Sequence, residues 1–368
     1  ITDVITTTCV IPLEQKGLSI SNRLLQERHF TIVRIKTDVG IDGIGFTYCG
    51  NLGGRIVTLA IQELLKSLII GRDPHQVEDI WDSMYKHSLL HGRRGSVLRA
   101  ISAIDIALWD VISKNAGLPL YKYLGEYHEN TVPAYASGGY YASNKGPDEL
   151  AEEMNRYKEM GFTAMKMKLG GLSPKEDALR VKAAREAIGE ESLLFLDANN
   201  AYQNSTNAIE AIKLFEEHNP GWIEEPLMPD DLRGHAKVAE VVKTPVATGE
   251  IHATRWDFQL LIDYKSASIL QPDVGVCGGV TEIQRICSLA CAYDIPIAPH
   301  WLAEVHAHIV ASNPNAIWVE YFTDFDIINL GKLFKNRLEV DAGRIKLPQI
   351  PGLGIELDEK SIKQYSIE

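Results

Sequence analysis

A short apolar run followed by a helical pattern recurs through the last two-thirds of the chain. Eight such runs begin from Thr131 onward, roughly 20 to 30 residues apart. They are Val132–Gly138, Ala164–Leu169, Leu193–Asn199, Trp222–Pro226, Pro245–Glu250, Ser268–Val274, Ile295–His300 and Ile317–Phe322. Strands alternating with helices predict an α/β fold, and eight of them fit a closed parallel barrel of the TIM type. An open doubly wound sheet is the alternative, but no G-x-G-x-x-G turn follows the first run.

The first third of the chain has a different pattern. Val4–Ile11 and Phe30–Thr37 alternate as half-buried strands, and the glycines of VGIDGIGFTY (residues 39–48) mark a hairpin before a third strand. The polar segment Pro12–Arg28 between the first two strands has no clear period and is predicted to be a loop, of a length that often covers a site. Three helical patterns follow: Arg55–Ser67, Pro74–Tyr85 and Ser96–Asn115.

Three domains are expected from these patterns. Strands followed by helices predict an N-terminal α+β capping domain over residues 1–125. The barrel is predicted over residues 126–332, with its last helix short or missing. Residues 333–368 read as short strands and turns and are predicted to pack back on the capping domain.

Composition excludes several classes of partner. With 45% hydrophobic and 23% charged residues the chain is typical of a globular protein, and its net charge of −12 argues against nucleic acid or an anionic membrane as a partner. No apolar run approaches the roughly 18 residues of a spanning helix, and no signal-like segment opens the sequence. The five cysteines lack paired C-x-x-C spacing, which favours a reducing compartment. We therefore expect a cytoplasmic protein.

The apolar runs end on ionisable residues, and in a parallel barrel the carboxyl ends of all strands meet at the face where active sites lie. Seven consecutive runs share this feature, which core packing does not explain. Their polar residues are Lys166 and Lys168, Asp197 and Asn199, Glu224 and Glu225, Glu250, Asp273, His300, and Glu320. Alternation along a strand places both lysines on one face, where they require acidic partners or a charged ligand.

Three of these carboxylates belong to adjacent strands. Asp197, Glu224 and Glu250 would form a set of hard oxygen ligands suited to Mg²⁺, which takes few protein ligands and keeps positions for substrate oxygens. Without a cation their mutual repulsion would be unfavourable. Ca²⁺ and Zn²⁺ are expected to fit less well, Zn²⁺ because no histidine or thiol belongs to the set, whereas Mn²⁺ could substitute. The alternative is that each carboxylate is a salt-bridged strand end.

Titratable groups flank this trio on both sides. Lys166 and Lys168 lie on one side, where a neighbouring cation and apolar walls would lower the pKa of a lysine and make it a base. Asp273 and His300 lie on the other, where the aspartate would fix the histidine tautomer and raise its basicity. Two such groups around a metal-held substrate predict proton chemistry at one carbon from two faces.

The order K-x-K, D-A-N, E-E-P, G-E, P-D, H and E at successive strand ends resembles the enolase superfamily, specifically its mandelate racemase subgroup. The resemblance covers nearly the whole chain and implies a capping domain, a (β/α)7β barrel and a tail that returns to the cap. It also implies small-molecule carboxylate substrates and a homo-oligomer, since members are commonly dimers or octamers.

Roles for individual residues follow from the resemblance. It implies Mg²⁺ ligation by Asp197, Glu224 and Glu250. It implies that Lys168 is the base on one face, with Lys166 near the substrate carboxylate. His300, paired with Asp273, would act on the other face. Glu320 would hydrogen-bond the enolised carboxylate, and Asn199 would help to hold the substrate.

Three reactions start from the enediolate that forms when the α-proton leaves. Loss of a β-hydroxyl dehydrates an acid sugar to a 2-keto-3-deoxy acid, reprotonation on the opposite face racemises or epimerises, and loss of a β-carboxylate cycloisomerises. We expect dehydration, because the cap segments Pro12–Arg28 and Tyr48–Arg55 are polar and suit a polyol. The basic run His91–Arg94 is read as a solvated patch, with binding of a distal carboxylate as the alternative. A barrel that only binds a ligand would not need proton-transfer groups.

Overall fold

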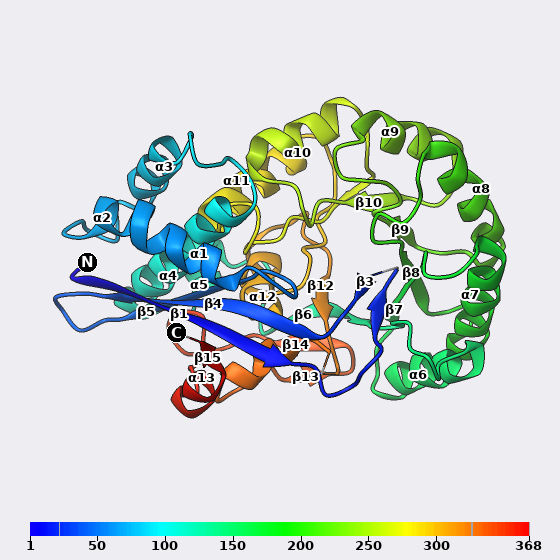
Figure 1. Ribbon diagram of the computed structural model, residues 1–368, viewed down its shortest axis with the longest axis horizontal. Coiled ribbons are helices and arrows are strands. Elements are labelled where there is room, and N and C mark those ends of the chain that lie inside the picture. Colours follow the sequence, from blue (N-terminus) through cyan, green and yellow to red (C-terminus); the bar gives the residue numbers. More distant parts are fainter. Residues whose placement is uncertain (22, 325–326, 368) are drawn as a thin grey trace.

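The apolar runs form a closed barrel in the computed structural model, which describes residues 1–21, 23–324 and 327–367 (Figure 1). Its parallel strands are β6 (Thr131–Ser137), β7 (Ala164–Lys168), β8 (Leu193–Asp197), β9 (Trp222–Glu224), β10 (Val246–Thr248), β11 (Ile269–Leu270) and β12 (Val319–Tyr321). Neighbours in the chain pair from β6 to β11, and β12 pairs with β6. The predicted TIM-type barrel is therefore confirmed.

The seventh predicted strand, Ile295–His300, is not a regular strand. Only Ile297 makes β-bridges, to Leu270 on one side and Ala316 on the other. Pro296 and Pro299 carry no N–H group and so cannot donate to a ladder, which accounts for the interruption. The barrel still closes, because Ile297 spans the gap between β11 and the segment that leads into β12.

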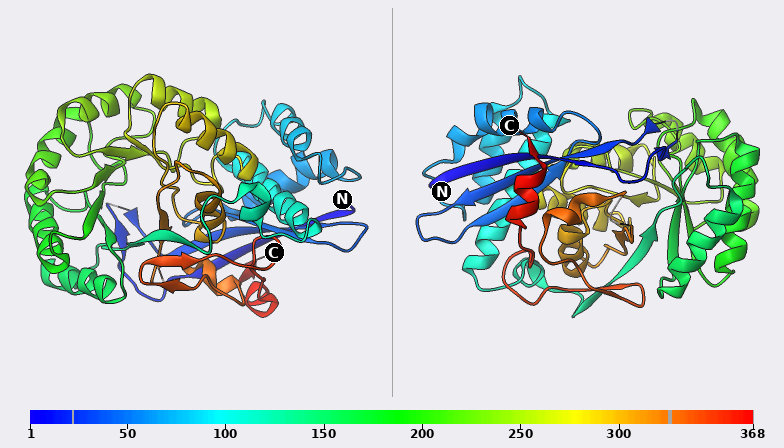
Figure 2. Two further views of the ribbon diagram at one scale, coloured as in Figure 1. Left: turned by 180° about the vertical axis from the view of Figure 1, so that it is seen from behind. Right: turned by 60° about the horizontal axis from the view of Figure 1, so that its bottom comes forward.

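Helices surround the barrel on its outside (Figures 1 and 2). They are α6 (Pro147–Glu159), α7 (Pro174–Ile188), α8 (Ser205–Phe215), α9 (Leu232–Val241), α10 (Thr254–Asp263), α11 (Val280–Cys291) and α12 (Ala303–Ser312), with a 3₁₀ turn at Glu216–His218. Local sequence sets their starts: at α7, Ser173 accepts from the Glu176 N–H and Pro174 occupies the first turn. In the described part of the chain between β12 and the C-terminal tail, a 3₁₀ turn (Asn329–Leu333) stands in place of an eighth barrel helix, so the architecture is (β/α)7β.

One layer of side chains fills the barrel interior below the strand ends. Its members come from successive strands: Tyr135, Ala164, Phe195, Trp222, Ala247, Ile269 and Ala298. Phe195 and Trp222 stack with centroids 3.5 Å apart, and Tyr135 meets both edge-on. This layer forms a dry floor for the polar residues above it.

The capping domain is an antiparallel sheet covered by helices. It contains β1 (Asp3–Pro12), β4 (Glu27–Lys36), β5 (Gly43–Tyr48), α1 (Gly54–Ala60), a π-helical turn (Ile61–Leu65), α2 (Lys66–Ile69), α3 (Val77–His87), α4 (Ser96–Asn115) and the connecting α5 (Leu120–Gly125). The segment predicted as a loop, Pro12–Arg28, contains a small hairpin of β2 (Ser19–Ile20) and β3 (Arg23–Leu24). Its buried leucines, among them Leu18 and Leu25, anchor it, and it extends over the barrel beside β7 and β8 (Figure 1).

The C-terminal tail contacts both domains. Its hairpin of β13 (Val340–Asp341) and β14 (Arg344–Lys346) pairs antiparallel with β6 of the barrel. Helix α13 (Glu359–Tyr365) then leads to β15 (Ser366–Ile367), which pairs with β1 of the cap (Figure 2). The division at residues 125 and 332 stays a prediction.

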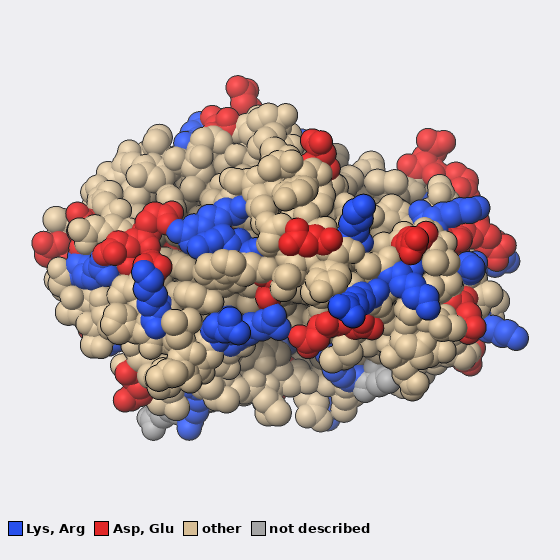
Figure 3. Space-filling model, turned by 90° about the horizontal axis from the view of Figure 1, so that it is seen from above, with Lys and Arg blue, Asp and Glu red and all other residues tan. Residues whose placement is uncertain are grey.

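The surface carries charges of both signs. On the face shown in Figure 3, acidic and basic side chains are interspersed, with no broad basic surface. Across the described residues, no helix combines the length and the apolar character that crossing a membrane requires.

Candidate active site

Strand β7 carries two buried lysines toward the barrel axis, while Met165 and Met167 pack in the core on its other face. Lys166 Nζ lies 2.7 Å from Glu224 Oε1, 2.7 Å from Glu320 Oε1 and 3.4 Å from Asp197 Oδ2. Lys168 Nζ lies 2.5 Å from Asp197 Oδ2. Both buried cations thus have the acidic partners that the sequence called for.

The electrostatic surroundings of the lysines differ from the expectation. Burial opposes their ammonium forms, but Glu224, Glu320 and Asp197 outweigh it and raise the pKa of Lys166 well above its ordinary value. The pKa of Lys168 is raised as well, chiefly by Asp197. The prediction of a lowered lysine pKa was wrong for this arrangement, because carboxylates rather than cations are the nearest neighbours.

The structure brings Asp197, Glu224 and Glu250 together. They lie at the ends of β8 and β9 and just beyond β10, and one oxygen of each falls within 4.8 Å of the others. The two lysines hold the pKa of Asp197 below its usual range against the effect of burial. Burial and the Asp197 charge raise the pKa of Glu224 to about 8. The cluster therefore resists full ionisation unless another cation joins it.

A divalent cation fits this trio. Glu250 Oε2 is buried and has no hydrogen-bond partner among the described residues. The set consists only of carboxylates, which favour hard cations over those that select imidazole or thiolate. Gln271 Nε2 and Trp222 Nε1 both donate to Glu224 Oε2, at 2.7 and 3.2 Å, and fix its orientation.

His300 and Asp273 form a pair at the Glu250 end of the trio. Nδ1 of His300 lies 2.8 Å from Asp273 Oδ2, and the Gly275 N–H donates to Asp273 Oδ1 at 2.7 Å. Nε2 is then directed toward Glu250 Oε2, at 3.5 Å. Burial alone would lower the pKa of His300, but Glu250, Asp273 and Glu320 raise it to about 9. The predicted increase in basicity is confirmed.

Glu320 on β12 lies between the lysine side and the His300 side of the site. One of its oxygens meets Lys166, and the other accepts from the Trp301 N–H at 2.8 Å. Burial would raise its pKa, but Lys166, His300 and Lys168 lower it to about 2. Asn199 lies at the edge, with its backbone in the left-handed region and its buried Oδ1 without a partner among the described residues. All nine residues to which the sequence analysis gives a role therefore line the carboxyl-end face of the barrel.

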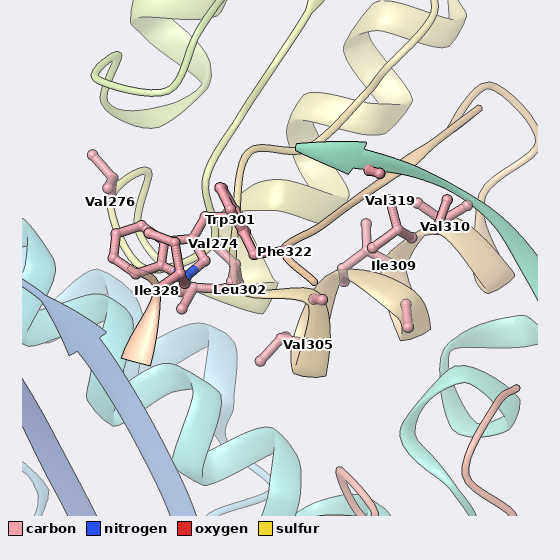
Figure 4. Packing of buried hydrophobic residues seen from close by; sticks show 14 of the residues in the cluster. Val274, Val276, Trp301, Leu302, Val305, Ile309, Val310, Val319, Phe322 and Ile328 are labelled. Carbon is pink, nitrogen blue, oxygen red and sulfur yellow. The ribbon is translucent and has the colours of Figure 1, made fainter. Parts of the chain in front are cut away.

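Sequence reasoning missed the groups that the cap and neighbouring loops contribute. The Tyr48 hydroxyl, at the end of β5, donates to Asp273 Oδ2 at 3.0 Å and lies 3.4 Å from His300 Nδ1. Its ring packs on Trp301, with centroids 4.1 Å apart. Trp301 itself belongs to the apolar cluster of Val274, Leu302 and Phe322 (Figure 4). The sequence placed Tyr48 only in a polar cap segment, and its contact with Asp273 could not be predicted because the two residues are more than 200 positions apart.

Of the basic run His91–Arg94, Arg94 contacts the barrel. Arg94 pairs with Asp230 and Asp257 of the barrel, at 3.1 and 2.7 Å. It lines a cavity of about 240 Å³ between cap and barrel together with Arg99 and His252. His91, Arg93 and Arg94 are exposed, as expected for a solvated patch, and Arg94 in addition takes part in the contact between the two domains.

Relatives of known activity match the chain over nearly its whole length. Arabinonate dehydratase of Saccharolobus solfataricus is 34% identical over 96% of this chain and 94% of its own. L-talarate/galactarate dehydratase of Salmonella typhimurium is 35% identical over 95% of this chain and 85% of its own. The 3,6-anhydro-alpha-L-galactonate cycloisomerase of Streptomyces coelicolor is 32% identical over 97% of both.

Solved structures share the fold. A racemase from Streptomyces coelicolor with bound magnesium superposes with a TM-score of 0.93 at 32% identity, covering 100% of this chain and 99% of that one. L-talarate dehydratase from Polaromonas sp. JS666, complexed with Mg and L-glucarate, superposes with a TM-score of 0.91 at 33% identity. The match covers 100% of this chain and 97% of that one.

Two family models match the chain in succession. Residues 3–125 match the N-terminal domain of the mandelate racemase / muconate lactonizing enzyme family, and residues 149–361 match the enolase C-terminal domain-like family. The chain belongs to the mandelate racemase group of the enolase superfamily.

Proposed function

We propose that this protein dehydrates a hydroxylated carboxylic acid of the acid-sugar class to a 2-keto-3-deoxy acid. The observation that carries the proposal is the placement of Lys168 and His300 around the carboxylate trio. Lys168 contacts its Asp197 end and His300 its Glu250 end. A carbon held between them is open to proton transfer from two sides.

Asp197, Glu224 and Glu250 would hold Mg²⁺. When bound, the ion would ligate the substrate carboxylate, offset the charge that develops on it and offset the Asp197 charge that keeps Lys168 an ammonium. Lys166 would stabilise the same developing charge, because its buried ammonium already lies among the carboxylates of that side. Glu320 would orient the enolised carboxylate, and Asn199 would contact the substrate through its free amide oxygen.

These residues account for the proton that the substrate loses and for the proton that the leaving hydroxide gains. Lys168, as the free amine, takes the α-proton, and the electrons of the C–H bond pass into the carboxylate to give an enediolate. These electrons return to form a C=C bond as the β C–O bond breaks. His300 gives the proton on Nε2 to the departing hydroxide, so that water leaves, and the enol becomes the keto acid. Asp273 holds Nδ1 and would thereby direct Nε2 to the departing hydroxyl group.

Dehydration is supported by the relatives that are dehydratases of acid sugars. Epimerisation or racemisation uses the same two residues and ends with reprotonation in place of loss of hydroxide. Cycloisomerisation is the third candidate, since one relative is a cycloisomerase.

The test incubates the enzyme and Mg²⁺ in D₂O with a panel of acid sugars. We expect 2-keto acid to form from at least one member, and Lys168→Ala and His300→Asn to abolish its formation. Exchange of the α-proton without keto acid would reassign the protein to epimerisation. No exchange and no product with any acid, together with full activity of either variant on another substrate, would refute the proposed roles.

Single variants also separate the two faces. Lys168→Ala should remove α-proton exchange from one epimer and retain exchange of the epimer whose proton faces His300. His300→Asn should give the opposite pattern. An equal loss of α-proton exchange from both epimers in each variant would contradict the assignment of one residue to each face.

A further inference from the structure

Arg28, at the start of β4, is a buried cation with few partners. The residue is 6% exposed, and its Nε donates only a long hydrogen bond, of 3.5 Å, to the Ile327 carbonyl. Among the described residues no carboxylate lies within ion-pairing distance of it. A guanidinium has five N–H donors, and burying an unpaired charge is costly, so this arrangement requires another partner.

The other buried arginines of the chain show what a structural role looks like. Arg180 is 2% exposed; it pairs with Asp177 and donates to the Lys168 and Gly139 carbonyls. Arg185 is 4% exposed and donates to four backbone carbonyls. Both use most of their donors within the protein. Arg28 does not, although it is buried to a similar extent.

The neighbours of Arg28 locate it over the active site. Its guanidinium lies over the Trp301 ring, 5.5 Å from the centroid, and Trp301 directly follows His300. Burial lowers the pKa of Arg28, while Tyr140 and Tyr48 act in the opposite direction. Tyr140 in turn lies 5.5 Å from Lys168 Nζ, and Tyr48 bonds Asp273. Arg28 is thus flanked by one aromatic group from each side of the site.

We infer that Arg28 binds a second, distal carboxylate of the substrate, so that the preferred substrate is an acid sugar with a carboxylate at both ends. The reacting carboxylate belongs at the trio with Lys166, deep in the barrel. The far end of the carbon chain then points to the cap, where Arg28 offers a planar, bidentate partner for a carboxylate. This inference rests on the proposed function and narrows its substrate class.

The test compares acids that differ only at the distal end. The pair is an aldarate and the aldonate of the same configuration, and the quantity is the ratio of their kcat/KM values for keto acid formation. We expect the wild type to favour the aldarate. Arg28→Met should lower that ratio roughly 10- to 100-fold, the range for a hydrogen-bonded charge pair. Arg28→Lys keeps the positive charge but loses the bidentate guanidinium, so its ratio should lie between those of the wild type and Arg28→Met.

A matched control lies on the same strand. Arg34 pairs with Glu359 on the tail, so Arg34→Met removes one positive charge from β4 at a distance from Trp301. Its ratio should equal that of the wild type. If Arg28→Met does not fold, the comparison is made with Arg28→Lys.

Two results would overturn the inference: a wild-type preference for the aldonate, or an equal loss of kcat/KM on both acids in the Arg28 variants. A third acid with a terminal phosphate, if preferred over the aldarate, would also overturn it.

Binding separates this inference from the proposed reaction. In the presence of Mg²⁺, calorimetric titration of the Lys168→Ala variant with each acid should show tighter binding of the aldarate than of the aldonate. Adding the Arg28→Met substitution to this variant should remove the difference in affinity. If no acid reacts but this difference is found, the reaction is wrong and the distal site stands. If acids react and the difference is absent, the distal site is wrong and the reaction stands.

Discussion

Lys166 and Lys168 are two positions apart on β7, but their surroundings differ. Lys166 is fully buried between Glu224 and Glu320 and lies over the Tyr135 ring of the barrel floor. Among the described residues Lys168 has one carboxylate partner, Asp197, and it lies beside Tyr140. A cation fixed by several carboxylates suits charge stabilisation, whereas a cation with one partner can be released to transfer a proton.

Tyr48 positions the second proton-transfer group. Burial and the Asp273 charge raise its pKa well above the ordinary value, so the hydroxyl remains a donor. Its hydrogen bond holds Asp273 Oδ2, which in turn holds His300 Nδ1. Tyr48→Phe removes this bond and keeps the ring on Trp301. We expect exchange from the His300 face to slow about 10-fold or more, as loss of a hydrogen bond to a charged group predicts, with exchange from the Lys168 face unchanged. The measurement is epimer-specific exchange in D₂O.

A second tyrosine provides the control for Tyr48→Phe. Tyr157 is buried and its hydroxyl donates to Glu153 Oε1 at 2.6 Å, outside the barrel centre. Tyr157→Phe therefore removes the same kind of hydrogen bond and should leave the ratio of the two exchange rates at the wild-type value. A similar slowing on both faces in Tyr48→Phe would indicate general disruption and contradict the positioning role.

At the scale of elements, the site depends on strand ends that meet only when the barrel forms. Asp197 ends β8, Glu224 ends β9 and Glu250 follows β10. An ion that needs all three carboxylates binds the folded barrel and not the unfolded chain. Mg²⁺ at about 100 times its dissociation constant should add about 2.7 kcal/mol to the free energy of unfolding. Thermal unfolding with and without EDTA measures this gain.

Glu250→Gln tests whether the trio is responsible for that gain. The variant keeps the size of the side chain and removes one anionic ligand, so the rise in Tm with Mg²⁺ should shrink or vanish. Glu240→Gln, on the outer helix α9, is a control that should keep the full rise. An undiminished rise in Glu250→Gln would place the stabilising ion elsewhere.

Strand-end residues could be predicted from the sequence because a parallel barrel gathers them at one face whatever its exact register. The interruption at Ile295–His300 could also have been predicted, since Pro296 and Pro299 remove ladder donors. Arg28 and Tyr48 could not, because their roles arise where the capping domain meets the barrel. That contact pairs residues more than 200 positions apart, and neither strand pattern distinguishes them from ordinary members of a sheet.

For the whole molecule, the contact between cap and barrel decides the shape of the site. Helix α4 of the cap lies against the start of α11 of the barrel, and its side chains bond the loop before that helix. Ser102 Oγ accepts from the Gly278 N–H at 3.0 Å, and Trp109 Nε1 donates to Thr281 Oγ1 at 2.8 Å. These bonds hold the cap that carries Arg28 and Tyr48 against the barrel that carries the trio.

Asp105 makes this contact sensitive to pH. Its carboxylate is fully buried and accepts from the Thr281 N–H at 2.8 Å and from Thr281 Oγ1 at 2.6 Å. Burial raises its pKa to about 7, and the two hydrogen bonds only partly offset that effect. In the unfolded chain the pKa is about 3.9. Between these values the folded protein binds a proton that the unfolded chain has lost, so the free energy of unfolding decreases as the pH rises.

Asp105→Asn removes this titration and can keep both contacts with Thr281, because an amide offers one acceptor and one donor. The contribution of Asp105 is fully present below about pH 4 and is lost as the pH passes through 7. The free energy of unfolding of the variant, relative to the wild type, should therefore increase by up to about 4 kcal/mol between pH 4 and pH 8. Urea unfolding across this range measures the difference. A difference that stays constant, or that shifts toward the wild type, would show that Asp105 is ionised in the folded protein and that water or a cation reaches the contact between cap and barrel.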